Sequence, residues 1–351
     1  MLDALGLGPA PTPSRIALRL PGVRLRAYAG GTAAPVLLIV PAPIKRAYIW
    51  DLAPPVSVIR RCLGEGLAVY LVDWSEADTL GLGDYADRLL SACLDCVTRE
   101  TGQSRVALAG HSLGGTLAAI FASLHPERVR TLVLLEAPTK FGGDTGPFAP
   151  LVAMTPRAAL RETFDAIPGS FFDLVSVTAS PLSFLTARWL DRLAVAGDPV
   201  ALATHWRVER WALDEFPLPG RFFEEVVEQL YREDRFLAGR LSINGRTASP
   251  AALAMPILGV VRPESRIIPP QSVQPLHDIA PSRRQRLLRY HGDRGVSLQH
   301  VGVLVGTTAH RLIWPVILRW IKAGARPPAS RLRVHGDMPA RADERSNGER
   351  Q

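Results

Sequence analysis

The sequence predicts an α/β fold in which a mostly parallel β-sheet is flanked by helices. Short continuous apolar runs, such as residues 36–40, have the pattern of strands that are buried on both faces. These runs alternate with helical patterns, which is typical of parallel sheets whose connections are helices. One run, starting at Val106, breaks into Gly-His-Ser-Leu-Gly at residues 110–114, directly before another helical pattern.

Local patterns predict the first elements. Residues 15–28 alternate apolar and polar side chains across a Pro-Gly turn, which predicts an antiparallel edge hairpin. The apolar run at 36–40 predicts the first buried strand. A helical pattern at 57–65 then leads through Gly66 into a second buried strand at 68–72.

The alternation of strand and helix patterns continues through the centre of the chain. Residues 84–99 have helical apolar spacing, and the strand from Val106 follows them. A further apolar run at 131–135 predicts the next strand. The sheet resumes at 256–261, and the last helix is expected near 310–323.

Between the strand at 131–135 and the strand at 256–261 the pattern is helical and rich in large aromatic side chains. This insertion is expected to form its own aromatic core. It is also expected to act as a cap that covers the serine of the Gly-His-Ser-Leu-Gly segment and excludes water. The predicted organisation is a leader and edge hairpin at 1–34, an α/β core at 35–138 and 250–323, a helical cap at 139–249, and a disordered tail at 324–351.

Ser112 is the candidate nucleophile. In a strand–turn–helix with the sequence Gly-x-Ser-x-Gly, the glycines leave room for a sharp turn that lifts the serine hydroxyl clear of the chain. The helix that follows directs backbone N–H groups at a developing oxyanion, with Leu113 as the first donor. The second donor is expected from Ile44, because Pro43 before it has no N–H. The alternatives are a structural turn at Ser112 and a plain connecting loop at Ile44.

A serine needs a base and an orienting acid, which follow it along the chain in this class of fold, the α/β hydrolases. His300 is predicted to be the base because it lies in a loop after the alternating stretch at 287–290. His291 and His310 compete, although His310 has the pattern of a helix-surface residue. A purely structural His300 is the remaining alternative.

Glu264 is predicted to be the acid, since it is the only carboxylate in the loop after the strand at 256–261. Asp234 and Asp293 are the alternatives, and a dyad without an acid is a further one.

Composition narrows the class of protein. The 351 residues carry a net charge of +8 with scattered basic residues, which favours a solvated arginine-rich surface over nucleic-acid binding. Cys62, Cys93 and Cys96 cannot form a disulfide framework, and the lone C-x-x-C within a helical pattern argues against a metal site. No signal peptide or membrane span is predicted, so we expect a cytoplasmic protein without a cofactor.

Several segments resemble one family in the right order along residues 35–322. They include Pro41-Ala-Pro-Ile-Lys-Arg-Ala-Tyr-Ile-Trp-Asp-Leu52, Gly66-Leu-Ala-Val-Tyr-Leu-Val-Asp-Trp74, Leu82-Gly-Asp-Tyr85, Gly110-His-Ser-Leu-Gly-Gly115, Phe236-Leu-Ala-Gly-Arg-Leu-Ser-Ile-Asn-Gly-Arg246, Met255-Pro-Ile-Leu258, Ile267-Ile-Pro-Pro270, Gln299-His-Val-Gly-Val303 and Ile313-Trp-Pro315. Together they resemble the polyhydroxyalkanoate synthase family in its short form. The resemblance implies an α/β-hydrolase core, a mobile cap, and (R)-3-hydroxyacyl-CoA substrates polymerised through a covalent thioester.

The sequence departs from this family at its reactive positions. Ser112 stands where the family has a cysteine nucleophile, and Ser265 stands where the family has a catalytic aspartate. Leu298 and Gln299 replace a Gly-Gly doublet that commonly precedes the family's histidine. A serine ester is a poorer leaving group than a thioester, and its usual fate in hydrolases is attack by water.

Three functions follow as hypotheses. The first is a serine acyl hydrolase or acyltransferase acting on hydroxyacyl esters or CoA thioesters, and the second is a polymerising synthase. The third is a silent homologue that binds polymer granules or a synthase partner. The expected partners are therefore an acyl thioester or polyester substrate, and a homo-oligomer or a partner subunit, with granule association in the cytoplasm.

Overall fold

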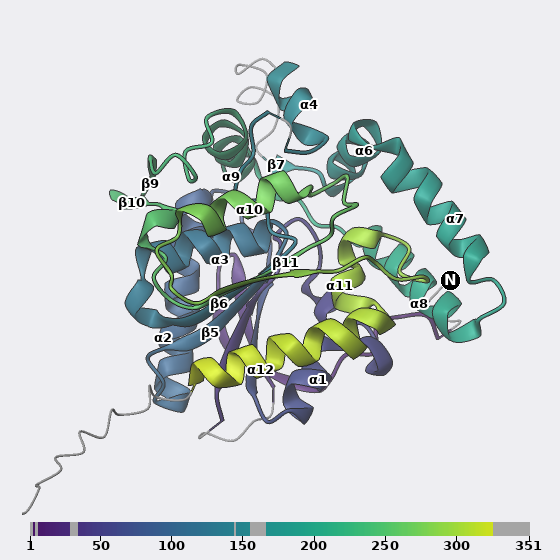
Figure 1. The fold of residues 1–351 in the computed structure, drawn as a ribbon, viewed down its shortest axis with the longest axis horizontal. Coiled ribbons are helices and arrows are strands. Elements are labelled where there is room, and N and C mark those ends of the chain that lie inside the picture. Colours follow the sequence, from purple (N-terminus) through teal and green to yellow (C-terminus); the bar gives the residue numbers. More distant parts are fainter. Residues whose placement is uncertain (1–2, 4–5, 29–33, 144, 155–165, 326–351) are drawn as a thin grey trace, which may run out of the picture.

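The computed structural model describes residues 3, 6–28, 34–143, 145–154 and 166–325 (Figure 1). Its main sheet has eight strands in the order β1-β2-β4-β3-β5-β6-β11-β12. The pairs β1–β2 and β2–β4 are antiparallel, and the other neighbours are parallel. The predicted α/β-hydrolase fold is confirmed.

The strands of the main sheet are β1 (Ser14–Leu20), β2 (Val23–Tyr28), β3 (Val36–Val40), β4 (Ala68–Trp74), β5 (Val106–His111), β6 (Val129–Leu135), β11 (Ile257–Val261) and β12 (Gln285–Arg289). Two short ribbons lie outside it, β7 (Ala166–Ile167) with β8 (Leu218–Pro219), and β9 (Leu241–Ile243) with β10 (Arg246–Ala248). The α-helices are α1 (Val58–Gly64), α2 (Leu89–Thr101), α3 (Leu113–Leu124), α4 (Phe148–Met154), α6 (Gly169–Ala179), α7 (Ala187–Ala194), α8 (Pro199–Ala212), α9 (Gly220–Glu225), α10 (Pro270–Ile279), α11 (Gly302–Val305) and α12 (Trp314–Ala325).

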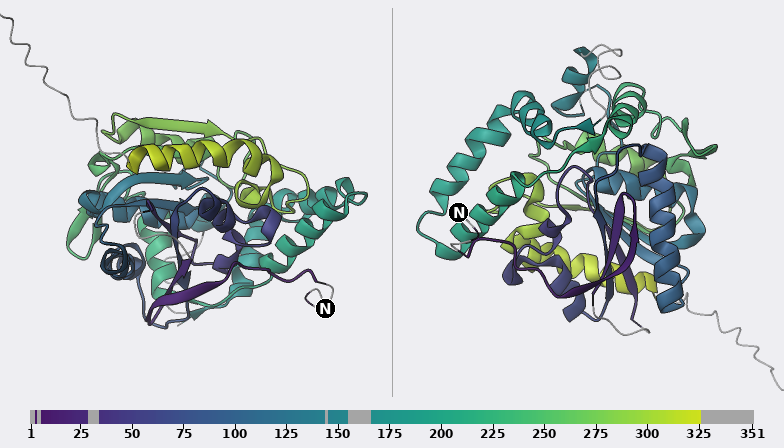
Figure 2. Two further views of the ribbon diagram at one scale, coloured as in Figure 1. Left: turned by 90° about the horizontal axis from the view of Figure 1, so that it is seen from below. Right: turned by 180° about the vertical axis from the view of Figure 1, so that it is seen from behind.

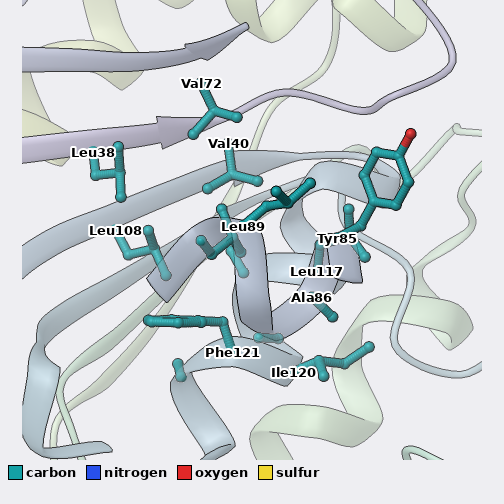
Figure 3. Packing of buried hydrophobic residues seen from close by; sticks show 14 of the residues in the cluster. Leu38, Val40, Val72, Tyr85, Ala86, Leu89, Leu108, Leu117, Ile120 and Phe121 are labelled. Carbon is teal, nitrogen blue, oxygen red and sulfur yellow. The ribbon is translucent and has the colours of Figure 1, made fainter. Parts of the chain in front are cut away.

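The central strands are buried on both faces because successive side chains point to opposite sides of the sheet. Leu38 of β3 and Leu108 of β5 pack with Leu89 of α2 and with Leu117 and Phe121 of α3 (Figure 3). All five side chains are buried. This face explains why the strand patterns are continuously apolar rather than alternating.

The other face of the sheet is covered by α1, α11 and α12. Leu37 and Ile39 of β3 belong to the same apolar cluster as Ile59 of α1 and Trp314 of α12. Neither strand residue is exposed to solvent. Because helices cover both faces, the carboxyl edge of the parallel strands is the place left for a site.

The chain between β6 and β11 is the insertion predicted to cover the site, and it is called the cap below. It contains α4, α6, α7, α8 and α9, with the two short ribbons among them. Helices α6 and α7 extend beyond the sheet (Figures 1 and 2). In the described residues no single helix has both the length and the apolar composition needed to cross a membrane. The predicted tail lies outside the described residues from position 326 onward.

Candidate active site

Ser112 lies at the junction of β5 and α3. Its backbone has φ 54° and ψ −136°, a conformation that L-residues rarely adopt. The Ser112 N–H donates to the carbonyl of Leu135 at 3.0 Å, and the Ser112 carbonyl accepts from Gly115 at 2.9 Å. The turn is therefore fixed by backbone hydrogen bonds on both sides, and it has the strained geometry of a nucleophile elbow.

The glycines of the motif are required by close backbone approaches. A Cβ on Gly110 would lie 2.5 Å from the Cα of Gly115, and a Cβ on Gly114 would lie 2.3 Å from the carbonyl oxygen of Val40. Both distances are far below contact, and the obstructing atoms belong to the main chain. The helix can thus start directly behind the serine only if these two residues have no side chain.

One cavity of about 250 Å³ brings together four of the predicted site residues. Ser112, Leu113, Ile44 and His300 all line it. Leu113 is the first residue of α3, where backbone N–H groups have no partner within the helix. Much of the remaining lining is apolar and comes from the cap and the loop after β11, including Phe141, Phe148, Leu151, Val152, Phe172, Val175, Phe184, Leu218, Phe222, Phe223, Val226, Val227, Ile267 and Ile268.

His300 lies in a one-turn 3-10 helix, Gln299–Val301, after β12. Its backbone carbonyl lies 2.8 Å from Nε2 of His111, and the two rings are 4.5 Å apart. Because a carbonyl can only accept, Nε2 of His111 carries the proton. Burial lowers the pKa of His300 to about 4 and that of His111 to about 3, so both rings are neutral at neutral pH. A neutral imidazole is the form that a general base requires.

The carboxylate beside His300 is Glu136, which the sequence reasoning did not identify. Oε2 of Glu136 lies 3.4 Å from Nδ1 of His300, and the Glu136 side chain is fully buried. Burial raises the pKa of the Glu136 carboxyl to about 7, while His111, Arg262 and the Ser265 hydroxyl favour its charged form.

Strand register explains how Glu136 reaches this position. Glu136 directly follows β6, and in the β5–β6 pair His111 is opposite Leu135, so Glu136 comes opposite Ser112. The Glu136 N–H donates to the carbonyl of Val260 on β11 at 2.9 Å. A lone carboxylate directly after a continuous apolar strand, next to the elbow strand, was the signal that could have found it.

The structure does not bring Glu264 to His300. Glu264 is exposed, and its Oε1 lies 2.8 Å from Nδ1 of His291, which is also exposed. At the next position, Ser265 is buried, and its Oγ accepts from the N–H of Ile268 at 3.1 Å. The loop after β11 therefore turns Ser265 inward toward Glu136 and leaves Glu264 in solvent.

The alternative residues lie away from the serine and have structural contacts. The carboxylate of Asp234 accepts from the N–H of Phe141 at 3.3 Å, and that of Asp293 accepts from the N–H of Thr308 at 2.9 Å. The prediction that His310 lies on a helix surface is wrong. It is buried, with Nε2 2.7 Å from the carbonyl of Leu304, because the last helix packs against the sheet.

Cys93 and Cys96 both lie on α2 and are buried in the core. Burial raises the pKa of each thiol. Both therefore stay protonated at neutral pH and contribute to packing.

Comparisons with known proteins agree with this geometry. Residues 35–187 match the family model described as alpha/beta hydrolase fold. In structure, the chain is similar to a monoacylglycerol lipase from Paleococcus ferrophilus, with a TM-score of 0.56 and 14% sequence identity over 86% of this chain and 99% of the lipase. The protein thus has the α/β-hydrolase fold.

The relatives found by sequence similarity belong to a narrower group of proteins than the family model does. It is 29% identical to a poly(3-hydroxyalkanoate) polymerase subunit of Haloferax mediterranei, over 88% of this chain and 63% of that protein. It is 26% identical to the corresponding subunit of Allochromatium vinosum, over 82% of this chain and 81% of that protein. Over most of its length the chain is similar to poly(3-hydroxyalkanoate) polymerase subunits, as its motifs indicate, and it spans just under two thirds of the Haloferax protein.

Proposed function

We propose that the protein is a serine acyl hydrolase or acyltransferase of the synthase type, acting on hydroxyacyl esters or coenzyme A thioesters. The observation that carries this proposal is the strained elbow conformation of Ser112 in a cavity that His300 also lines. The largely apolar lining suits an acyl chain. The net charge of +8 suits an anionic acyl carrier.

In the proposed reaction, Oγ of Ser112 attacks the acyl carbonyl and its proton moves to His300. The N–H groups of Leu113 and Ile44 hold the resulting oxyanion. Collapse of the tetrahedral intermediate breaks the carbonyl–sulfur or carbonyl–oxygen bond, and His300 gives its proton to the leaving group. Water, or the hydroxyl of a second acyl unit, then attacks the ester on Ser112 with His300 as base, which releases the product and restores the enzyme.

Glu136 is the proposed acid of this triad. When ionised, it stabilises the imidazolium that His300 becomes in each step, and its contact with Nδ1 leaves Nε2 to exchange the proton with the serine. The separation of 3.4 Å and the full burial of Glu136 support this role. Ser265, at the family's aspartate position, then supports the acid rather than replacing it.

A polymerising synthase is the second candidate. The observation in its favour is the extent of similarity to the poly(3-hydroxyalkanoate) polymerase subunits, which covers more than four fifths of this chain. The serine favours hydrolysis, because an oxygen ester transfers its acyl group to a hydroxyl less readily than a thioester does. The two candidates share the acyl-enzyme on Ser112 and differ in the acceptor.

The test is product analysis with 3-hydroxybutyryl-CoA. Wild type, Ser112→Ala and Ser112→Cys are compared for released coenzyme A, free hydroxy acid and polymer. We expect wild type to release coenzyme A with free hydroxy acid, and Ser112→Ala to be inactive. Polymer from the wild type would favour the second candidate. Full turnover by Ser112→Ala, or folded wild type that neither turns over nor reacts with an activated-serine probe, would contradict both.

The location and partners are part of the proposal. Exposed apolar side chains on α6 and α7, including Leu174, Trp189 and Leu190, suit contact with a polyester granule in the cytoplasm. The relatives are named polymerase subunits, which supports a homo-oligomer or a partner subunit. Fractionation with granules, compared with a variant in which Trp189 and Leu190 are replaced by serine, tests this location.

A further inference from the structure

A buried carboxylate joins the cap to the loop that carries His300. Asp191 lies on α7, and its side chain is almost completely buried. Its Oδ1 accepts from the N–H of Gly295 at 2.8 Å, and its Oδ2 accepts from the N–H of Ser297 at 2.8 Å. Oδ2 also lies 2.9 Å from Nδ1 of His205 on α8. One side chain of the cap therefore fixes two backbone amides just before the catalytic histidine.

A second set of polar contacts connects the same loop to the cavity that contains Ser112. The hydroxyl of Ser297 donates to Oε1 of Glu209 on α8. Arg188 of α7 holds the same carboxylate through Nε at 2.8 Å and Nη2 at 2.6 Å. Arg188 also lines the cavity that contains Ser112. The wall of the cavity and the histidine loop thus share one set of polar contacts.

The backbone of this loop needs such support. Ser297 has φ 55°, in the left-handed region that a residue with a side chain adopts only when its surroundings hold it there. Gly295 has φ 74°, and a Cβ there would lie 2.9 Å from the carbonyl oxygen of Ala201 on α8. The loop is pressed against the cap in a strained conformation, and His300 follows three residues after Ser297.

We propose that Asp191 is a positioning residue for His300. His300 takes its catalytic position only when the cap is packed against the loop that precedes it. Helices α7 and α8 both contribute to the cavity wall. Displacement of these helices to admit an acyl substrate removes the acceptor of two loop amides, and reseating restores it. Hydrolysis of a bound ester is thereby confined to the closed cap. This inference rests on the proposed function, because it takes His300 as the base.

The test variant is Asp191→Asn, which keeps the shape of the side chain but turns an amide NH₂ toward one of the donors. The matched control is Asp198→Asn, also in the cap, whose carboxylate accepts from the N–H groups of Val200 and Ala201 at the start of α8. We expect kcat to fall about 10- to 100-fold in Asp191→Asn, as for a small misplacement of a catalytic group, with KM changed less than about threefold. The control is expected to stay within about threefold for both constants.

A second measurement does not depend on turnover. Hydrogen exchange at the amides of Gly295 and Ser297 is expected to accelerate at least about tenfold in Asp191→Asn, and the imidazole NMR signals of His300, assigned with His300→Gln, are expected to shift. If Asp191→Asn lowers the melting temperature but leaves kcat, the loop amides and the His300 signals as in the control, the proposal is wrong. A wild type without any esterase activity would overturn the proposed function instead, while exchange and NMR still decide the coupling.

Discussion

Replacing Glu136 with glutamine tests the acid of the proposed triad most directly. Glutamine preserves the volume of the buried side chain and removes its charge. Because Oε2 lies 3.4 Å from Nδ1 of His300 and the Glu136 side chain is fully buried, the imidazolium formed during the reaction loses its counter-charge. We expect kcat to fall by about 10² to 10⁴, the range seen when a triad acid is neutralised, with little change in KM. Steady-state ester hydrolysis measures both constants.

The raised pKa of Glu136 predicts how the stability and the kcat of the protein depend on pH. Burial raises the pKa of Glu136 from 4.5 to about 7, which corresponds to about 3 kcal/mol against ionisation in the folded protein. The folded state therefore keeps a proton that the unfolded state releases, and the free energy of unfolding falls as pH rises from about 4.5 to about 7. We expect kcat of the wild type to rise as the carboxyl ionises near pH 7. Glu136→Gln is expected to lose this part of both profiles, measured by kinetics and by denaturant titration at several pH values.

Moving the carboxylate from position 136 to the loop after β11 distinguishes a loss of catalysis from a loss of folding. Ser265→Asp in the Glu136→Gln background places a carboxylate at the position where the resembled family has one, beside the side chain at position 136. We expect it to recover at least about tenfold in kcat over Glu136→Gln alone. The control is Glu264→Gln, which alters an exposed side chain and is expected to keep kcat within about twofold. Loss of activity in Glu264→Gln together with an unchanged rate in Glu136→Gln would refute this reasoning.

Three further outcomes follow from the same geometry. Ser112→Cys is expected to form polymer from 3-hydroxybutyryl-CoA, or at least to lower the ratio of free acid to released coenzyme A, because the thioester is a better acyl donor; an unchanged ratio contradicts this. Gly114→Ala forces a Cβ to within 2.3 Å of the Val40 carbonyl, so we expect about 3 kcal/mol or more of destabilisation and loss of reaction with a serine probe, whereas probe labelling at the wild-type rate contradicts it. Phe222→Ala removes a buried ring whose centroid lies 4.4 Å from that of the Tyr85 ring. We expect the free energy of unfolding, measured by denaturant titration, to fall by about 3 to 5 kcal/mol. A fall below about 1 kcal/mol would show that the cap does not depend on this contact.

Much of the fold could be predicted because it depends on local patterns. The runs at 36–40 and 131–135 are continuously apolar since helices cover both faces of the sheet, and the structure has strands there. Loop conformation was harder to predict. His310 was misjudged because a helical pattern does not show which face packs, and the inward turn of Ser265 depends on contacts with residues far away in sequence.

The sequence by itself determined the elbow, because Gly110, Ser112 and Gly114 are adjacent and their geometry is a local property of the backbone. It also determined the resemblance to polyhydroxyalkanoate synthases, through motifs in order along the chain. Only the tertiary structure identified the carboxylate beside His300. Glu136 and His300 are 164 residues apart, and they meet because parallel strands β5 and β6 bring their carboxyl ends together while the loop after β12 folds over them. The same holds for Asp191, whose contacts with the histidine loop depend on how the cap packs, and packing between distant segments has no periodicity in the sequence.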